Sequence, residues 1–102
     1  MTITKYDILE SLKQVIDPEL EVDIVDLGLI YDIKIDEQNK KASVFMTLTS
    51  KGCPLSNVIK FEVEESLKKL EGIENAEVNI VWEPEWNYSM IKPEILKKLH
   101  KH

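Results

Sequence analysis

The sequence predicts an α+β fold, a two-layer sandwich in which helices cover a small mixed sheet. Apolar residues recur at helical spacing in three segments and alternate with polar residues in three others. These segments follow one another in the order α-β-β-α-β-α. Runs of this kind favour helices packed on one face of a sheet. With 102 residues, the chain is expected to form a single domain, 1–102.

Three segments are expected to be helical. The first spans 4–16 and stops before Pro18, because the residue that precedes a proline is biased toward an extended conformation. The second spans 54–71 and is followed by Gly72, a typical residue after a helix end. The last begins at Pro93. The apolar face of the first helix consists of Ile8, Leu12, Val15 and Ile16.

The alternating segments are expected to be strands at 29–35, 42–50 and 76–82. The polar stretch 36–41 joins the first two as an antiparallel hairpin with one buried face. The side chains expected to face inward are Leu29, Tyr31, Ile33 and Ile35, then Ala42, Val44, Met46 and Leu48, then Ala76, Val78, Ile80 and Trp82. Residues 17–28, before the first strand, are expected to form an extended loop with its apolar side on the core.

The composition argues against two classes of partner. The net charge is −6 and there is no arginine, so the chain lacks the clustered basic residues that bind a nucleic-acid backbone. No apolar run approaches the roughly 20 residues needed to span a membrane. The first residues lack the basic and apolar regions of a secretory signal, which together with a single cysteine predicts a cytoplasmic protein.

The single cysteine, Cys53, is the strongest candidate for chemistry. If Pro54 is the first helical residue, Cys53 caps the helix, and its sulfur lies near the free amides of the first turn. That position favours the thiolate, which is both a nucleophile and a metal ligand. The positive charge of Lys51 would also favour the thiolate. Gly52 has no side chain, so it allows a close approach of the backbone and leaves the thiol without steric cover. The alternative is a buried, inert thiol.

Other candidates surround this thiol in the sequence. Thr49 could hydrogen-bond a group held by Cys53, although threonine is also a good strand residue. Five carboxylates precede the first strand, of which Asp26 lies between two apolar residues; the alternative is a solvated run of charges. Trp86 could contact a protein partner, or pack on the core with Trp82. The carboxylates are Asp17, Glu19, Glu21, Asp23 and Asp26.

Several strings of the chain match a known family in this order. They are DPE at 17–19, DIVDLGLIYDI at 23–33, MTLTSKGCPL at 46–55, LEGI at 70–73 and WEPEW at 82–86. With these strings the chain closely resembles the SufT-like, PaaD-like family of iron–sulfur cluster assembly domains over nearly its whole length. The chain lacks the additional C-terminal cysteine region associated with PaaD itself, which favours a stand-alone SufT-like protein.

The resemblance implies a fold similar to the C-terminal domain of NifU-type scaffolds and a role in maturing iron–sulfur proteins. It implies that Cys53 is the reactive residue, with Asp26 and Thr49 close to it. It also implies partners among the iron–sulfur assembly machinery and client apoproteins. The characteristic residues of the family match Glu19, Asp26, Gly28, Thr49, Cys53, Pro54 and Trp86.

Three functions follow from these residues. The first is an assembly factor in which Cys53 transiently ligates iron or a cluster, or docks a client, within a pocket of Asp26, Thr49, Glu19 and Gly52. One cysteine cannot supply four thiolates, so a homodimer or a partner would complete such a site. The second is a metal-free adaptor that binds through Trp86, the acidic loop and the last helix. The third is a thiol enzyme, which is disfavoured because both histidines lie in the C-terminal tail.

Overall fold

A computed structural model of the chain describes residues 3–17, 20–49 and 56–100. The predicted order of elements and the α+β class are confirmed, with one added 3-10 turn, η1. The elements are α1 (Lys5–Leu12), β1 (Ile30–Asp36), β2 (Lys41–Met46), α2 (Ser56–Lys68), β3 (Asn75–Ile80), η1 (Tyr88–Met90) and α3 (Pro93–His100). None of the helices among these residues has the length and apolarity needed to cross a membrane.

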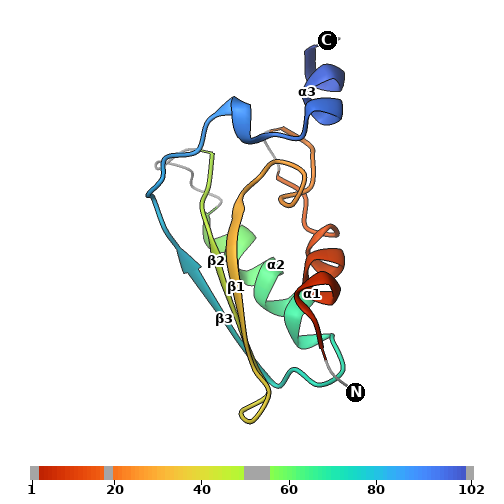
Figure 1. Cartoon of the computed structure of the whole chain (residues 1–102), viewed down its shortest axis with the longest axis vertical. Coiled ribbons are helices and arrows are strands. Elements are labelled where there is room, and N and C mark those ends of the chain that lie inside the picture. The colour runs from red at the N-terminus through yellow and green to blue at the C-terminus, as the bar shows by residue number, and fades with distance from the viewer. Residues whose placement is uncertain (1–2, 18–19, 50–55, 101–102) are drawn as a thin grey trace.

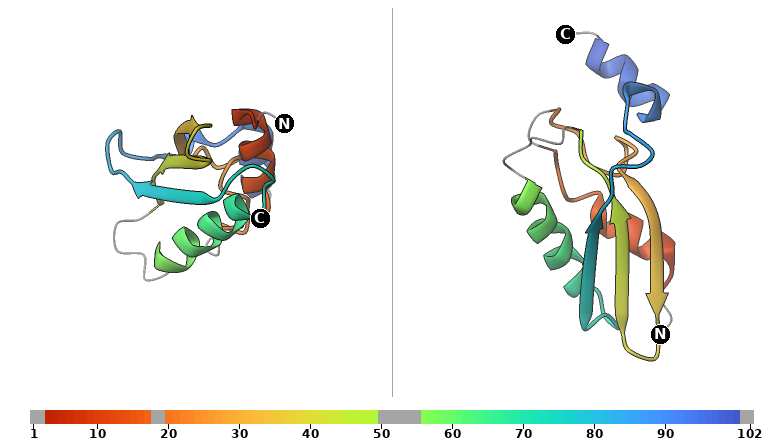
Figure 2. Two further views of the ribbon diagram at one scale, coloured as in Figure 1. Left: turned by 90° about the horizontal axis from the view of Figure 1, so that it is seen from below. Right: turned by 90° about the vertical axis from the view of Figure 1, so that its left-hand side faces the viewer.

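The strands form one mixed sheet in the order β1-β2-β3. β1 and β2 are antiparallel, as expected of a hairpin, and β2 and β3 are parallel. Figures 1 and 2 show α1 and α2 on the same side of this sheet, while α3 stands beyond one end of the strands. None of the helices that the structure describes lies over the opposite face of the sheet (Figure 2, right).

The core lies between the sheet and the two helices. At its centre Val44 is opposite Ile33 on one neighbouring strand and opposite Val78 on the other, and all three are buried. The prediction of inward-facing residues is therefore confirmed for the middle of each strand. The helices contribute Ile8, Leu12, Ile59, Val63 and Leu67 to the same core.

The inward orientation predicted for Tyr31 is wrong. Between Ile30 and Asp32 the pairing with β2 shifts by one residue, a bulge that strict alternation does not anticipate. Tyr31 therefore lines a hollow together with Ile30 and Phe45, next to the C-terminal segment. Its hydroxyl donates to the Pro84 carbonyl oxygen at 2.7 Å.

The first helix is shorter than predicted. Thr4 caps its start: the Asp7 N–H donates to the Thr4 hydroxyl, and the Asp7 carboxylate accepts from the Thr4 N–H. The helix ends at Leu12, and Ile16 instead forms an isolated bridge with Asp23 and is exposed. That bridge requires extended backbone, which removes Ile16 from the predicted helix face.

Candidate functional site

The predicted site residues that the structure describes, Asp26, Thr49 and Trp86, belong to segments that meet at one end of the molecule. The C-terminal end of β2, the segment that precedes β1 and the chain after β3 meet there (Figure 1). The Thr47 N–H donates to the Leu29 carbonyl oxygen, which joins the first two of these segments. Thr49, half-buried, is the last residue described before α2. Cys53, Gly52 and Glu19 lie outside the described residues, and so does the predicted helix cap at Pro54.

The acidic segment before β1 is folded into turns rather than extended. The Asp17 carboxylate accepts a hydrogen bond from the Leu20 N–H, and the Asp17 N–H donates to the Val22 carbonyl oxygen. The Asp23 carboxylate accepts from the Asp26 N–H at 2.9 Å. Side-chain oxygens of this kind favour turns because they satisfy backbone N–H groups locally. The expectation of an extended loop is therefore wrong, although its apolar side is anchored in the core, as predicted, through Ile24 and Leu27.

Asp26 is engaged in an ion pair. Its carboxylate lies 2.8 Å from the Lys92 ammonium, and its carbonyl oxygen accepts from the Lys92 N–H at 3.1 Å. The Lys92 hydrogen bond lowers the pKa of Asp26, and Asp26 in turn raises the pKa of Lys92. Burial is the main cause that raises the pKa of the neighbouring Asp23. Asp26 is thus held in its charged form by a cation from the C-terminal part of the chain.

Trp86 makes a second connection between the same two parts of the chain. Its indole N–H donates to the Leu27 carbonyl oxygen at 2.7 Å, and its ring is partly buried against the core. Together with the bonds made by Tyr31 and Lys92, this fixes residues 84–92, the C-terminal strap, against residues 26–31. The packing on the core that the sequence left open for Trp86 is thus present, and the hydrogen bond to Leu27 is added to it.

The strap also requires Gly28. Gly28 has φ +76°, in the left-handed region, and the Met90 carbonyl oxygen occupies the place where a Cβ would lie. Sequence reasoning missed the roles of Lys92, Met90 and Tyr31, because no spacing or motif pairs them with residues 26–28. Asp26 and Thr49 share no hydrogen bond within the described part of the chain.

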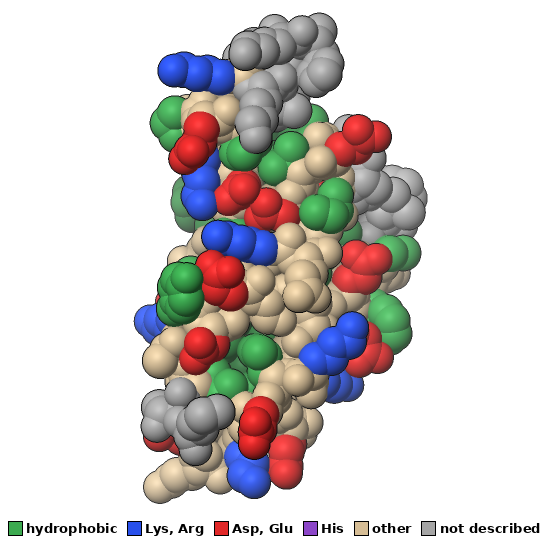
Figure 3. Space-filling view, turned by 90° about the vertical axis from the view of Figure 1, so that its right-hand side faces the viewer, with side chains coloured by type: hydrophobic (Ala, Val, Ile, Leu, Met, Phe, Trp, Pro, Cys, Tyr) green, Lys and Arg blue, Asp and Glu red, His purple; other side chains and the backbone are tan. Residues whose placement is uncertain are grey.

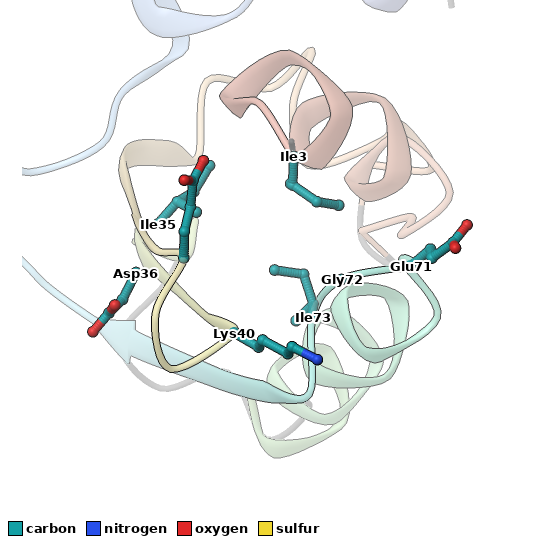
Figure 4. Close-up of a pocket in the computed structure, with 8 residues that line it drawn as sticks. Ile3, Ile35, Asp36, Lys40, Glu71, Gly72 and Ile73 are labelled. Atoms are coloured by element: carbon teal, nitrogen blue, oxygen red, sulfur yellow. The ribbon is translucent and has the colours of Figure 1, made fainter. Parts of the chain in front are cut away.

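A second hollow lies near the opposite end of the strands. It has a volume of about 390 Å³ and lies between the N-terminus, the β1–β2 hairpin and the turn after α2 (Figure 4). Ile3, Ile35 and Ile73 line it, and its charged Lys40 pairs with Glu74 at 3.7 Å. Asp26, Thr49 and Trp86, the predicted site residues that the structure describes, do not line it.

Charged side chains of both signs lie on the surface of the described residues. On the face seen in Figure 3, lysines are interspersed among carboxylates and do not form a continuous basic patch. Among the residues that the structure describes, no group of three or more His, Cys, Asp or Glu side chains is arranged to hold a metal ion.

The Asp26–Lys92 pair predicts a pH dependence. Lys92→Met is expected to lower the free energy of unfolding at neutral pH by about 1 kcal/mol, the upper range for a half-exposed ion pair. Because the pKa of Asp26 is lowered in the fold, its contribution is present above its ordinary value of 3.8 and is lost as pH falls through the folded pKa. Urea unfolding of both proteins at neutral and acidic pH measures this difference.

Lys97→Met is the matched control, because Lys97 is exposed on α3, which begins directly after Lys92, and makes no ion pair within the described residues. This control is expected to unfold like the parent at every pH. A loss for Lys92→Met that is as large in acid as at neutral pH would contradict the ion-pair explanation.

Comparison with known proteins gives a consistent result. The model of the family described as "Iron-sulfur cluster assembly protein" matches residues 5–80. The chain is 50% identical to the Fe-S protein maturation auxiliary factor YitW of Bacillus subtilis, over 80% of this chain and 79% of that protein. It is 47% identical to the Fe-S protein maturation auxiliary factor SufT of Staphylococcus aureus, over 76% of this chain and 86% of that protein.

Solved structures share the fold. A conserved hypothetical protein from Thermotoga maritima superposes with a TM-score of 0.83 at 46% identity, covering 96% of this chain and 97% of that one. A domain of unknown function from Bacillus anthracis superposes with a TM-score of 0.89 at 37% identity, covering 96% and 92%.

Proposed function

This chain belongs to the family of iron–sulfur cluster assembly proteins, and we propose that it acts in iron–sulfur protein maturation as a carrier whose Cys53 thiolate transiently ligates iron or a cluster. The cluster is cargo in this proposal, and client apoproteins and the assembly machinery are the partners. The maturation role is supported by relatives that are named maturation auxiliary factors. The proposal places this work in the cytoplasm.

The observation that carries the proposal is the count of thiols. The chain has one cysteine, whereas a standard cluster is held by four thiolates. A cluster bound through Cys53 must therefore take its other ligands from a second copy or from a partner. Shared ligation suits a carrier, because each thiolate can be exchanged for one from the receiving protein.

The contacts of the C-terminal strap refine the roles of the predicted pocket residues. Asp26 is already neutralised by Lys92, so we assign it to holding the strap in place rather than to metal ligation. Thr49 ends the described part of the chain after β2 and keeps its predicted role beside the thiol, as do Glu19 and Gly52. Trp86 donates its N–H to the Leu27 carbonyl oxygen, so we assign it to holding the strap in place as well.

A metal-free adaptor is the second candidate, and one observation favours it. Val58 and Phe61 lie one turn apart on α2 and are 50% and 60% exposed, although both are large and apolar. α2 begins only three residues after Cys53 in the sequence. A partner that covered these side chains would be brought near the thiol without any metal being bound.

Anaerobic reconstitution with iron and sulfide distinguishes the two candidates. The carrier predicts an absorbing cluster species on the parent protein that is lost in Cys53→Ala and that transfers to an apo-ferredoxin. The Val58→Glu/Phe61→Glu variant keeps the thiol and is expected to retain the cluster. Failure of the parent to acquire any chromophore, with client binding that survives Cys53→Ala, would overturn the carrier and favour the adaptor.

A further inference from the structure

The outer edge of β1 has backbone groups that the sheet does not use. The Met46 carbonyl oxygen accepts from the Val81 N–H, so this residue directs its backbone groups toward β3. Val44, two residues earlier on β2, does the same, and it lies opposite Ile33. Ile33 consequently points its N–H and C=O away from the sheet.

In the single chain, the outward N–H of Ile33 is satisfied by a side chain next to it in the sequence. The Ile33 N–H donates to the carboxylate of its own neighbour, Asp32, at 2.8 Å. No other hydrogen bond to the outward backbone groups of Ile33 or Ile35 is formed within residues 3–17, 20–49 and 56–100. β1 is an edge of the sheet, and in the end-on view of Figure 2 no ribbon continues the sheet beyond it.

The charges on this edge are self-complementary. Asp32 and Lys34 flank Ile33, both are exposed, and neither forms an ion pair in the described part of the chain. The Lys34 ammonium lies over the Phe45 ring, 5.3 Å from the ring centre. In an antiparallel pairing of two β1 strands centred on Ile33, each Asp32 lies opposite the partner's Lys34.

The neighbouring registers lack this match. Centring the pair on Asp32 or on Lys34 places two identical charges opposite each other, which is destabilising. In the register centred on Ile33, the two copies of Ile33 lie opposite each other. Because the N–H and C=O of Ile33 point outward, the two copies can exchange backbone hydrogen bonds. Hydrogen-bond direction and charge therefore select the same register.

We propose that the outer edge of β1 is a self-association surface, through which two copies of this chain form one continuous six-stranded sheet. The Asp32 carboxylate leaves the Ile33 N–H and turns to the partner's Lys34, while the N–H donates to the partner's Ile33. The association is weak and concentration-dependent, because each copy carries a net charge of −6. It does not depend on the proposed cluster chemistry.

Analytical ultracentrifugation of charge variants tests this surface. Asp32→Lys and Lys34→Asp each place like charges in opposition, and each is expected to weaken dimerisation about tenfold or more. The double variant Asp32→Lys/Lys34→Asp restores opposite charges and is expected to dimerise again. Glu37→Lys, on the exposed hairpin beyond the strand, is the control and is expected to leave dimerisation intact. All samples contain excess reductant, so that Cys53 cannot cross-link two copies.

Three results would overturn the proposal. The first is a parent protein that remains monomeric up to millimolar concentration. The second is a dimer that neither single variant weakens. The third is a dimer that the single variants weaken and the double variant does not restore, with circular dichroism showing that all variants are folded.

Discussion

Cells that carry Cys53→Ala in place of the parent chain are expected to lose activity of iron–sulfur enzymes to the level of a deletion when demand for clusters is high. The reason is that the chain has no second thiol to take over ligation or transfer. The measurement is the activity of a cluster-dependent enzyme, such as a dehydratase, relative to its protein level. Because the substitution is small, the abundance and melting temperature of the protein are expected to change little.

Thr49→Val is the companion variant for this experiment. It removes the hydroxyl of a residue that lies four positions before Cys53 in the sequence, but it leaves the Cys53 thiol in place. An intermediate loss is expected if Thr49 assists a group held by Cys53. Full enzyme activity in the Cys53→Ala strain under high demand would show that the thiol is dispensable, and the carrier would be abandoned.

Gly28→Ala is expected to cause the largest loss of stability among single substitutions near the strap, about 3 kcal/mol or more. Gly28 has φ +76°, and the Met90 carbonyl oxygen lies where the new methyl group would be placed. Relief requires movement of backbone rather than of a flexible side chain. We therefore expect the strap to separate from residues 26–31, with a lower urea midpoint and loss of the Trp86 fluorescence environment.

Gly72→Ala provides a matched comparison. Gly72 also has a positive φ, +96°, but the nearest atom to a new Cβ is the Ile3 side chain at 3.3 Å, which can move. Its expected cost is about 1 kcal/mol, mainly from the backbone conformation. Equal losses for the two alanine variants would show that the contact between Gly28 and Met90 contributes nothing.

The fold could be predicted from local patterns in most of its parts. The alternation around Val44 and the helical spacing that includes Leu12 are periodic signals, and periodicity depends only on which residues a face must bury. The prediction failed at Tyr31 and at Ile16. In both cases a single local event, a bulge or an isolated bridge, broke a regular pattern.

Less of the candidate site than of the fold could be predicted from local patterns. Asp26 and Trp86 were selected as candidates by resemblance and by their unusual surroundings in the sequence. Their contacts with Lys92 and Leu27 could not have been predicted, because the partners are far apart in the chain and no period relates them. The indole of Trp86 reaches a carbonyl oxygen 59 residues away.

The sequence by itself determined the class of fold, the order of its elements and the presence of one thiol, since these depend on composition and on short-range spacing. Only the tertiary structure decided that the strap packs against residues 26–31 and that Asp26 forms an ion pair with Lys92. It also decided that β1 is an edge strand with charged residues on either side of Ile33. These features arise from packing between distant segments. Such packing selects one arrangement out of many that the local pattern permits.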